Sequence, residues 1–153
     1  MIFLGIDPGK TGGISWHLSN AEGDIGCTSF TNKTPMDIYK AIKVLTTLGK
    51  PCIAMIEKVH SMPKQGVKSS FTFGQGYGFL LGCLTALEIP FEYVTPQKWQ
   101  RFLGCLSKGD KNVTKQKAQE LFPHLKITHA IADALLIGEY LKRTHYKNMD
   151  LEL

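Results

Sequence analysis

The chain has 153 residues, of which 43% are hydrophobic and 20% charged, the size and composition of one soluble globular domain with a full core. No apolar run approaches the roughly 18 residues of a membrane helix, no signal-peptide pattern opens the chain, and the four cysteines show no CxxC spacing, so we expect a cytoplasmic protein with reduced thiols. The formal net charge of +5 favours a polyanionic partner such as nucleic acid, without requiring one.

The first thirty residues predict a three-stranded meander. Met1–Ile6 is an almost uninterrupted apolar run, typical of a strand covered on both faces, and it stops at Asp7 before the strand-breaking Pro8-Gly9. Ile14–Trp16 and Ile25–Phe30, separated by a polar turn, predict the second and third strands. We therefore expect a carboxylate at the end of a central strand, beside glycines that let a phosphate approach closely.

The second buried strand repeats this design. A capped helix is predicted over Thr34–Leu48, where apolar residues recur at helical spacing. Cys52–Ile56 is then apolar throughout and ends at the carboxylate of Glu57. If the two buried strands are parallel neighbours, Asp7 and Glu57 meet at one edge of the sheet.

A basic loop and a glycine-rich helix follow. Residues 58–70 contain lysines together with Ser, Pro and Gly, which predicts a flexible loop. Phe71–Leu87 predicts a helix in which Gly74, Gly78 and Gly82 recur four residues apart. Such a stripe is typical of close packing of a helix on a sheet, which needs small residues on one side.

The C-terminal half completes a single domain. We expect a strand at Phe91–Val94, a helix from Thr95 that buries Trp99, Phe102 and Leu103, a basic loop at 108–112, and helices at Val113–Phe122 and His129–Lys142. Residues 144–153 are expected to form a polar, frayed tail beyond a domain of residues 1–143. This order of elements predicts an α/β fold with a mixed five-stranded sheet flanked by helices.

Three carboxylates stand in apolar surroundings: Asp7, Glu57 and Asp133, the last in an apolar run of the final helix. His129 precedes Asp133 by one helical turn. A cap or a local ion pair would explain any one acid, and His129 can be an ordinary first-turn residue. Crowded carboxylates, however, need compensating positive charge, and hard divalent cations supply it. Two such ions would favour phosphodiester hydrolysis by activating water and stabilising the leaving oxygen.

The sequence resembles the Holliday-junction resolvases of the RuvC type through five short motifs. In the right order over about residues 2–140, these are Gly5–Gly9 with Thr11-Gly12, Ile56–Val59, Gly74–Gly78, Thr95–Lys98 and His129–Leu135. The resemblance implies a ribonuclease H-like fold, a homodimer, and symmetric paired nicks in a four-way DNA junction. It also implies two Mg²⁺ ions per active site, for which Mn²⁺ substitutes.

Carried over residue by residue, the resemblance makes Asp7 and Glu57 the first two metal-binding acids and Asp133 the acid of the last helix. His129 stands near the remaining metal-binding position, but four residues before Asp133 where many bacterial members have a spacing of three. Bacterial members tend to carry an aromatic wedge three positions after the glutamate. Here that position is His60, which can still stack on a base.

The basic segments supply the candidate DNA contacts. The candidate DNA-binding residues of the two loops and the later helices are His60, Lys64, Lys68, Lys98, Lys108, Lys111 and Lys115. Each of the lysines is explained equally well as part of a solvated surface. The exposed apolar side of the Phe71–Leu87 helix is the expected dimer face. The short chain and its divergent loops are typical of a phage-type or otherwise divergent member.

Other interpretations can be weighed on the same residues. Gly9-Lys10-Thr11 is not a P-loop, because the pattern needs glycine five residues before Gly9 and that position is Leu4, so no nucleotide cofactor is expected. Two alternatives stay open: a nuclease of the same fold that acts on flaps, bubbles or RNA–DNA hybrids, and a module that binds branched DNA without cutting it. Buried acids would repel the phosphate backbone and so disfavour the pure binder.

Overall fold

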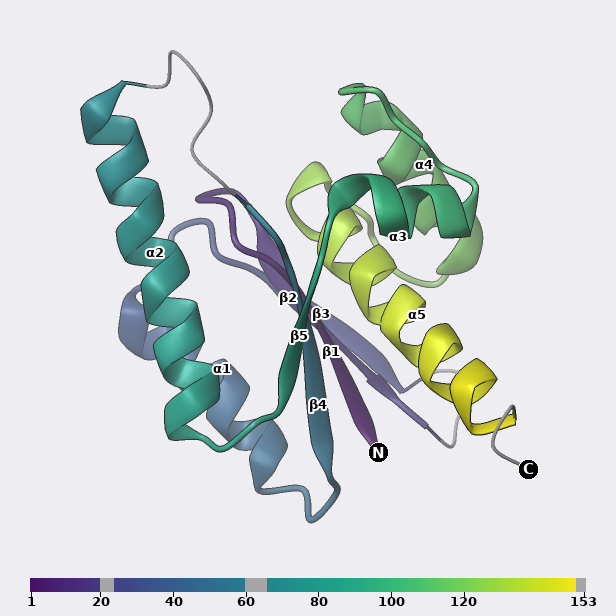
Figure 1. Cartoon of the computed structure of the whole chain (residues 1–153), viewed down its shortest axis with the longest axis horizontal. Helices are drawn as coiled ribbons and strands as arrows, with labels where there is room; N and C mark the ends of the chain where they lie inside the picture. Colours follow the sequence, from purple (N-terminus) through teal and green to yellow (C-terminus); the bar gives the residue numbers. More distant parts are fainter. Residues whose placement is uncertain (20–23, 60–65, 151–153) are drawn as a thin grey trace.

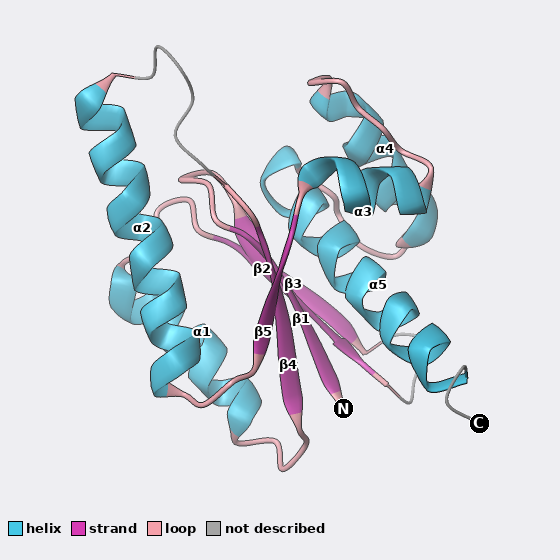
Figure 2. Ribbon diagram, in the orientation of Figure 1, coloured by secondary structure: helices cyan, strands magenta, loops and turns pink. Residues whose placement is uncertain are grey.

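A mixed five-stranded sheet forms the middle layer of the molecule (Figure 1, Figure 2). The computed structural model describes residues 1–19, 24–59 and 66–150. The strands are β1 (Ile2–Asp7), β2 (Gly13–Leu18), β3 (Ile25–Ser29), β4 (Cys52–Glu57) and β5 (Phe91–Val94), in the order β3-β2-β1-β4-β5. β1 pairs antiparallel with β2 and parallel with β4, and β4 pairs parallel with β5. The predicted α/β sheet is confirmed.

Helices cover both faces of the sheet. α1 (Pro35–Thr46) and α2 (Val67–Ala86) lie on one side, and α3 (Pro96–Leu103), α4 (Lys111–Leu121) and α5 (His129–Asp150) lie on the other (Figure 1). The alternating residues of β1 supply both cores. Phe3 packs with the α5 side, whereas Ile2 and Leu4 pack with the α1–α2 side. β1 is thus the central, doubly covered strand that its apolar run predicted.

The glycine stripe of α2 does not pack on the sheet, so that prediction is wrong. A Cβ added at Gly74, Gly78 or Gly82 would meet nothing within 4 Å. The helix instead buries Leu80 and Leu84, which lie on its opposite side. The larger aliphatic side chains remove more apolar surface from water than glycines can, and this decides which face turns to the sheet. α2 also starts at Val67 rather than Phe71 and so shortens the basic loop.

On α3, Trp99 and Leu103 are buried as predicted, but Phe102 is 44% exposed. Its ring rests edge-on against Tyr140 of α5, with centroids 5.1 Å apart. α3 is only eight residues long and presents one narrow face to the core, so a third large side chain stays at the rim.

The last helix continues beyond its predicted end near Lys142 and absorbs the expected tail as far as Asp150. The rings of His145 and Tyr146 stand edge-on to Phe3, with centroids 5.3 and 5.8 Å away. These contacts give the polar segment an apolar anchor that its composition did not reveal. Within the described residues, no helix combines the length and apolar character needed to cross a membrane.

Candidate active site

Three acidic side chains, from β1, β4 and α5, lie within electrostatic reach of one another at the carboxyl ends of the parallel strands. Asp7 ends β1 and Glu57 ends β4, and the two strands are in register with Ile6 opposite Ile56. Asp133 comes from the second turn of α5, which packs against β1 and β2. The negative charges of Asp7 and Asp133 both act on Glu57. The edge predicted to gather the acids does gather them.

Asp7 is held by the turn that follows it. The backbone N–H of Gly9 donates to Asp7 Oδ1 over 3.2 Å, and the N–H of Gly12 donates to Gly9 O over 2.8 Å. A Cβ at Gly12 would collide with the backbone and carboxyl carbons of Asp7, so the fold-back requires glycine. Burial raises the pKa of Asp7 to about 6 against the Gly9 hydrogen bond, and the charge of Asp133 adds to the rise.

Glu57 is oriented by a tryptophan. The indole N–H of Trp99 donates to Glu57 Oε1 over 2.9 Å. Burial raises the pKa of Glu57 to about 7, and the charges of Asp7 and Asp133 contribute further, while the indole hydrogen bond opposes the rise. The neighbouring negative charges therefore suppress the ionisation of Glu57 and of Asp7.

Among the described residues, one oxygen of Asp133 has no hydrogen-bond partner. Burial raises the pKa of its carboxyl group, against a hydrogen bond with the Thr114 side chain and the charges of Lys111 and His129. Its Oδ1 is buried and accepts no hydrogen bond from the described residues. His129, the exposed first residue of α5, acts on Asp133 through its charge. An unpartnered carboxylate oxygen next to two other acids is a group that lacks a cation or a donor.

Lys111 faces all three acids. Its charge lowers the pKa of Asp7, Glu57 and Asp133 alike. α4 begins at this lysine because Asp110 caps the helix and accepts the N–H of Asn112 over 2.9 Å. The sequence placed Lys111 among the DNA-binding residues, and the structure places it at the acids.

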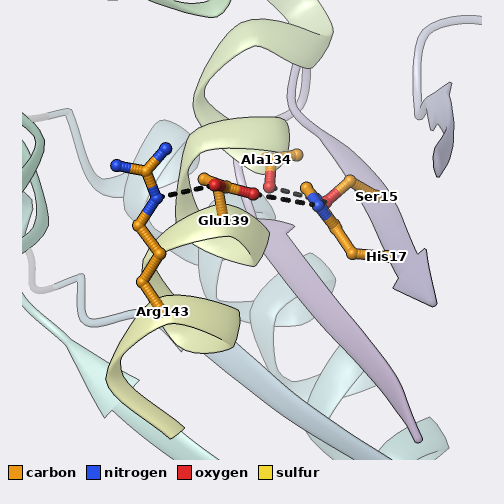
Figure 3. Close-up of polar contacts among 5 residues, drawn as sticks. All are labelled: Ser15, His17, Ala134, Glu139 and Arg143. Atoms are coloured by element: carbon orange, nitrogen blue, oxygen red, sulfur yellow. Dashed lines mark hydrogen bonds and ion pairs between the residues drawn. The ribbon is translucent and has the colours of Figure 1, made fainter. Parts of the chain in front are cut away.

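Polar contacts between α5 and β2 hold the helix against the sheet (Figure 3). The Ser15 hydroxyl donates to Ala134 O over 2.7 Å and accepts from His17 Nε2 over 3.2 Å. His17 Nδ1 lies 3.6 Å from Glu139 Oε2, too far for a hydrogen bond. Burial alone would raise the pKa of Glu139, but the contacts with His17 and with Arg143, whose Nε donates over 2.7 Å, lower it to about 2.

Two glycines let the helix and the sheet touch. A Cβ at Gly5 would collide with Ala134 O and Gly138 N, and a Cβ at Gly138 would collide with the His17 ring. The backbone of α5 therefore lies against β1 at Ala134, the residue that follows Asp133. The polar contacts and the glycines set the position of this acid relative to Asp7.

Metal ligation was tested on the same geometry. Among the described residues, no group of three or more His, Cys, Asp or Glu side chains is close enough to hold a metal ion. The acids act on one another through their charges, but they are not close enough together to surround one ion. Their chemistry nevertheless fits hard divalent cations, since they are oxygen donors, they repel one another, and Asp133 Oδ1 has no partner. A bound cation would reverse the repulsion that raises their pKa values.

The other predicted contacts are scattered around this edge. Lys68 lies in the first turn of α2, Lys98 on α3 and Lys108 in the turn before α4, all exposed, while Lys115 is half-buried on α4. His60 and Lys64 lie outside the described residues.

No protein-family model and no curated protein sequence matches the chain. Among solved structures, Thermus thermophilus RuvC is similar with a TM-score of 0.61 and 19% identity over 98% of this chain and 97% of that one. RuvC of the same organism in complex with a Holliday junction substrate gives 0.58 and 17%, over 97% and 96%. The yeast mitochondrial Holliday junction resolvase gives 0.50 and 14%, over 96% and 83%.

The chain has the RuvC fold. The likeness spans nearly the whole chain, so the ribonuclease H-like architecture predicted from the motifs is confirmed. In this chain the RuvC fold brings the ends of β1 and β4 and the second turn of α5 to one edge of the sheet. At identities of 14–19%, the structural likeness establishes the architecture alone.

Proposed function

We propose that the protein is a metal-dependent endonuclease that resolves four-way DNA junctions by paired nicks. The observation that carries this proposal is the placement of Asp7, Glu57 and Asp133 at one edge of the sheet, where burial raises the pKa of all three, Asp133 acts on the other two, and Asp133 Oδ1 has no partner among the described residues. Such an acidic site is unsuited to binding phosphate by itself and suited to doing so through cations. The similarity to RuvC and to a mitochondrial junction resolvase supports the junction as substrate.

The roles of the site residues follow from their positions. Asp7, which ends the central strand and interacts through its charge with Glu57 and Asp133, would bridge both ions, while Glu57 and Asp133 would each hold one. His129 would complete the site or orient the attacking water. Two Mg²⁺ or Mn²⁺ ions, when bound, activate water and stabilise the leaving oxygen.

The surrounding groups prepare these acids. Gly9 N–H and the Trp99 indole hold two carboxylates in fixed orientations before substrate arrives. Lys111 would supply a positive charge to the scissile phosphate. The exposed lysines Lys68, Lys98 and Lys108 would neutralise neighbouring phosphates, so binding should weaken steeply with salt.

Paired nicks require two active sites, and we propose a homodimer formed through the outer face of α2. Val67 and Phe71 are 88% and 66% exposed there, next to the open glycines Gly74 and Gly78. A second copy would cover these apolar side chains, and the glycines would let two helix backbones approach. Sedimentation of Phe71→Asp, compared with wild type, checks this face: the variant should be monomeric.

The deciding experiment is cleavage of a labelled synthetic four-way junction beside a linear duplex, a flap and an RNA–DNA hybrid, with Mg²⁺ or with EDTA. We expect metal-dependent paired nicks in the junction alone. Preference for the flap or hybrid would keep the site and change the substrate. Tight junction binding with no cleavage under any metal would refute the endonuclease.

A further inference from the structure

A second feature lies beside the acids, on the α1–α2 side of the sheet. A cavity of about 870 Å³ opens between α1, α2 and the turn from β1 to β2. Its lining includes the rings of Phe30, Phe73 and Phe79 and the side chains of Lys10, Lys33 and Lys68. Phe30 is buried and the other two rings are half-buried, whereas the three lysines are exposed. The cavity therefore has an aromatic interior and a positively charged mouth.

This combination fits a nucleotide. A nucleobase is flat and largely apolar across its face, so it stacks on phenylalanine rings, and its phosphate is anionic and pairs with lysine. Ligand cavities of this volume hold molecules of nucleotide size and above. A purely apolar ligand would make no ionic contact with the lysines, and a simple anion would make no contact with the aromatic interior.

The cavity adjoins the proposed site of cleavage. Gly9, whose N–H donates to Asp7 Oδ1, lines the cavity, as does Pro8. Asp7 and Gly9 are two residues apart, a span of at most about 7 Å of backbone, so a strand whose phosphate lies at Asp7 would have a neighbouring nucleotide within reach of the cavity. A second copy of the chain fits less well, because α2, the helix proposed for the dimer face, has no acidic residue to pair with the lysines.

We propose that the cavity takes up one nucleotide of the strand being cut, unstacked beside the scissile phosphate. This inference rests on the proposed nuclease function and adds a second contact to it. Bases at a branch point lose less stacking and pairing energy on extrusion than bases within a duplex. The cavity would therefore favour branched over linear DNA at the chemical step.

The test fills the cavity from one exposed position and leaves a matched position as control. Thr72 and Thr85 are both exposed threonines of α2, but only Thr72 lines the cavity. Thr72→Phe should occupy it, whereas Thr85→Phe should not. Thermal unfolding and sedimentation of both variants should match those of wild type, which separates cavity filling from misfolding or loss of the dimer.

The readout is 2-aminopurine placed singly at each nucleotide within three positions of the cut, in junctions bound by Asp7→Asn protein so that no cleavage occurs. We expect fluorescence to rise at one position adjacent to the cut, and to stay low there when Thr72→Phe is added but not when Thr85→Phe is added. With an active site intact, Thr72→Phe should lower cleavage about tenfold, and an abasic site at that nucleotide should abolish the difference from wild type.

The failures are distinguishable. If wild type cuts junctions but no position brightens, or if Thr72→Phe leaves the brightening unchanged, the nucleotide cavity is wrong and the nuclease stands. If Thr72→Phe yields monomers, the cavity belongs to the dimer interface and the proposal is overturned. If wild type cuts no nucleic acid, the proposed function itself is refuted, and the cavity proposal falls with it.

Discussion

The two faces of the sheet are built in opposite ways. On the α5 side, Gly5 and Gly138 bring the helix backbone against β1, and the buried hydrogen bond from Ser15 to Ala134 O joins the layers. On the α1–α2 side, α2 packs through Leu80 and Leu84, and a cavity opens between the first half of α2, α1 and the turn from β1 to β2. The α5 side of the sheet, the closed face, fixes the acids. The α1–α2 side, the open face, leaves room for a substrate.

The difference begins in β1. Its residues alternate between the two faces, so Phe3 and Gly5 point to α5 while Ile2, Leu4 and Ile6 point to α1 and α2. A glycine on the α5 side permits backbone contact, which places Asp133 beside Asp7 with little freedom. Bulky isoleucine and leucine on the other side hold the helices further off. β1 thus contributes to the rigid acidic site on the α5 side and to the more open surface on the α1–α2 side.

Removing an acid at the closed face should have the largest effect. Asp7→Asn should lower junction cleavage at least about a thousandfold, because it removes the proposed bridging ligand, while junction binding persists. Single-turnover cleavage at saturating protein measures the loss, and a binding titration serves as its control. Cleavage within tenfold of wild type would remove Asp7 from the site.

The same variant carries a pH signature. The pKa of Asp7 is raised to about 6, so wild type binds a proton in the folded state between about pH 4 and 6 and loses stability as pH rises through that window. Asparagine does not ionise. Without metal, the free energy of unfolding of Asp7→Asn should therefore exceed that of wild type by a few kcal/mol at pH 8 and equal it near pH 4. Urea unfolding measures both values.

A pair of glycine substitutions compares the α5–β1 contact with an open position on the outer side of α2. Gly5→Ala drives a methyl group into the α5 backbone and should cost about 3 kcal/mol of unfolding free energy. Gly82→Ala on α2 meets nothing within 4 Å and should add roughly 0.5–1 kcal/mol through helix propensity. Urea midpoints measure both. If Gly5→Ala is tolerated as well as Gly82→Ala, the backbone of α5 does not lie against β1 as described.

Removing Lys111 should have a smaller, two-sided effect. Lys111→Met takes away the charge that all three acids feel, so at pH 8.5, where the acids are ionised, Mn²⁺ should bind several-fold more tightly by calorimetry. Cleavage at saturating metal should nevertheless fall about tenfold, because the phosphate loses a charged donor. Lys98→Met, at an exposed position on α3, should leave metal affinity unchanged.

Local signals in the sequence predicted the strands and the acids because each depends on neighbours along the chain. An apolar run ending in a carboxylate marked both Asp7 and Glu57, and their meeting followed once β1 and β4 proved parallel. The α2 stripe shows the limit. A period of four tells which glycines share a face, but the direction of that face was decided by Leu80 and Leu84, whose burial depends on the sheet.

The supporting residues of the site could not be predicted because they act across long sequence separations. Trp99 was expected in the core, and a buried indole N–H needs an acceptor, yet only the fold reveals that Glu57 supplies it. From the sequence, Lys111 was expected in a basic loop. The structure shows that Asp110 caps α4 and that Lys111 is the first residue of this helix. Thr114 carried no signal of its bond to Asp133.

The Trp99–Glu57 hydrogen bond gives the smallest and sharpest prediction. The pKa of Glu57 is about 7 even though the indole N–H lowers it, so Trp99→Phe, which keeps most of the packing and loses the donor, should raise that pKa further. The acidic limb of the cleavage–pH profile should move to higher pH by up to about one unit, the equivalent of one hydrogen bond to a charged group. At pH 9, where Glu57 is ionised in both proteins, the rates should converge. A uniform loss at every pH would instead mean that Trp99 only supports the fold around α3, and that Glu57 does not depend on its indole for ionisation.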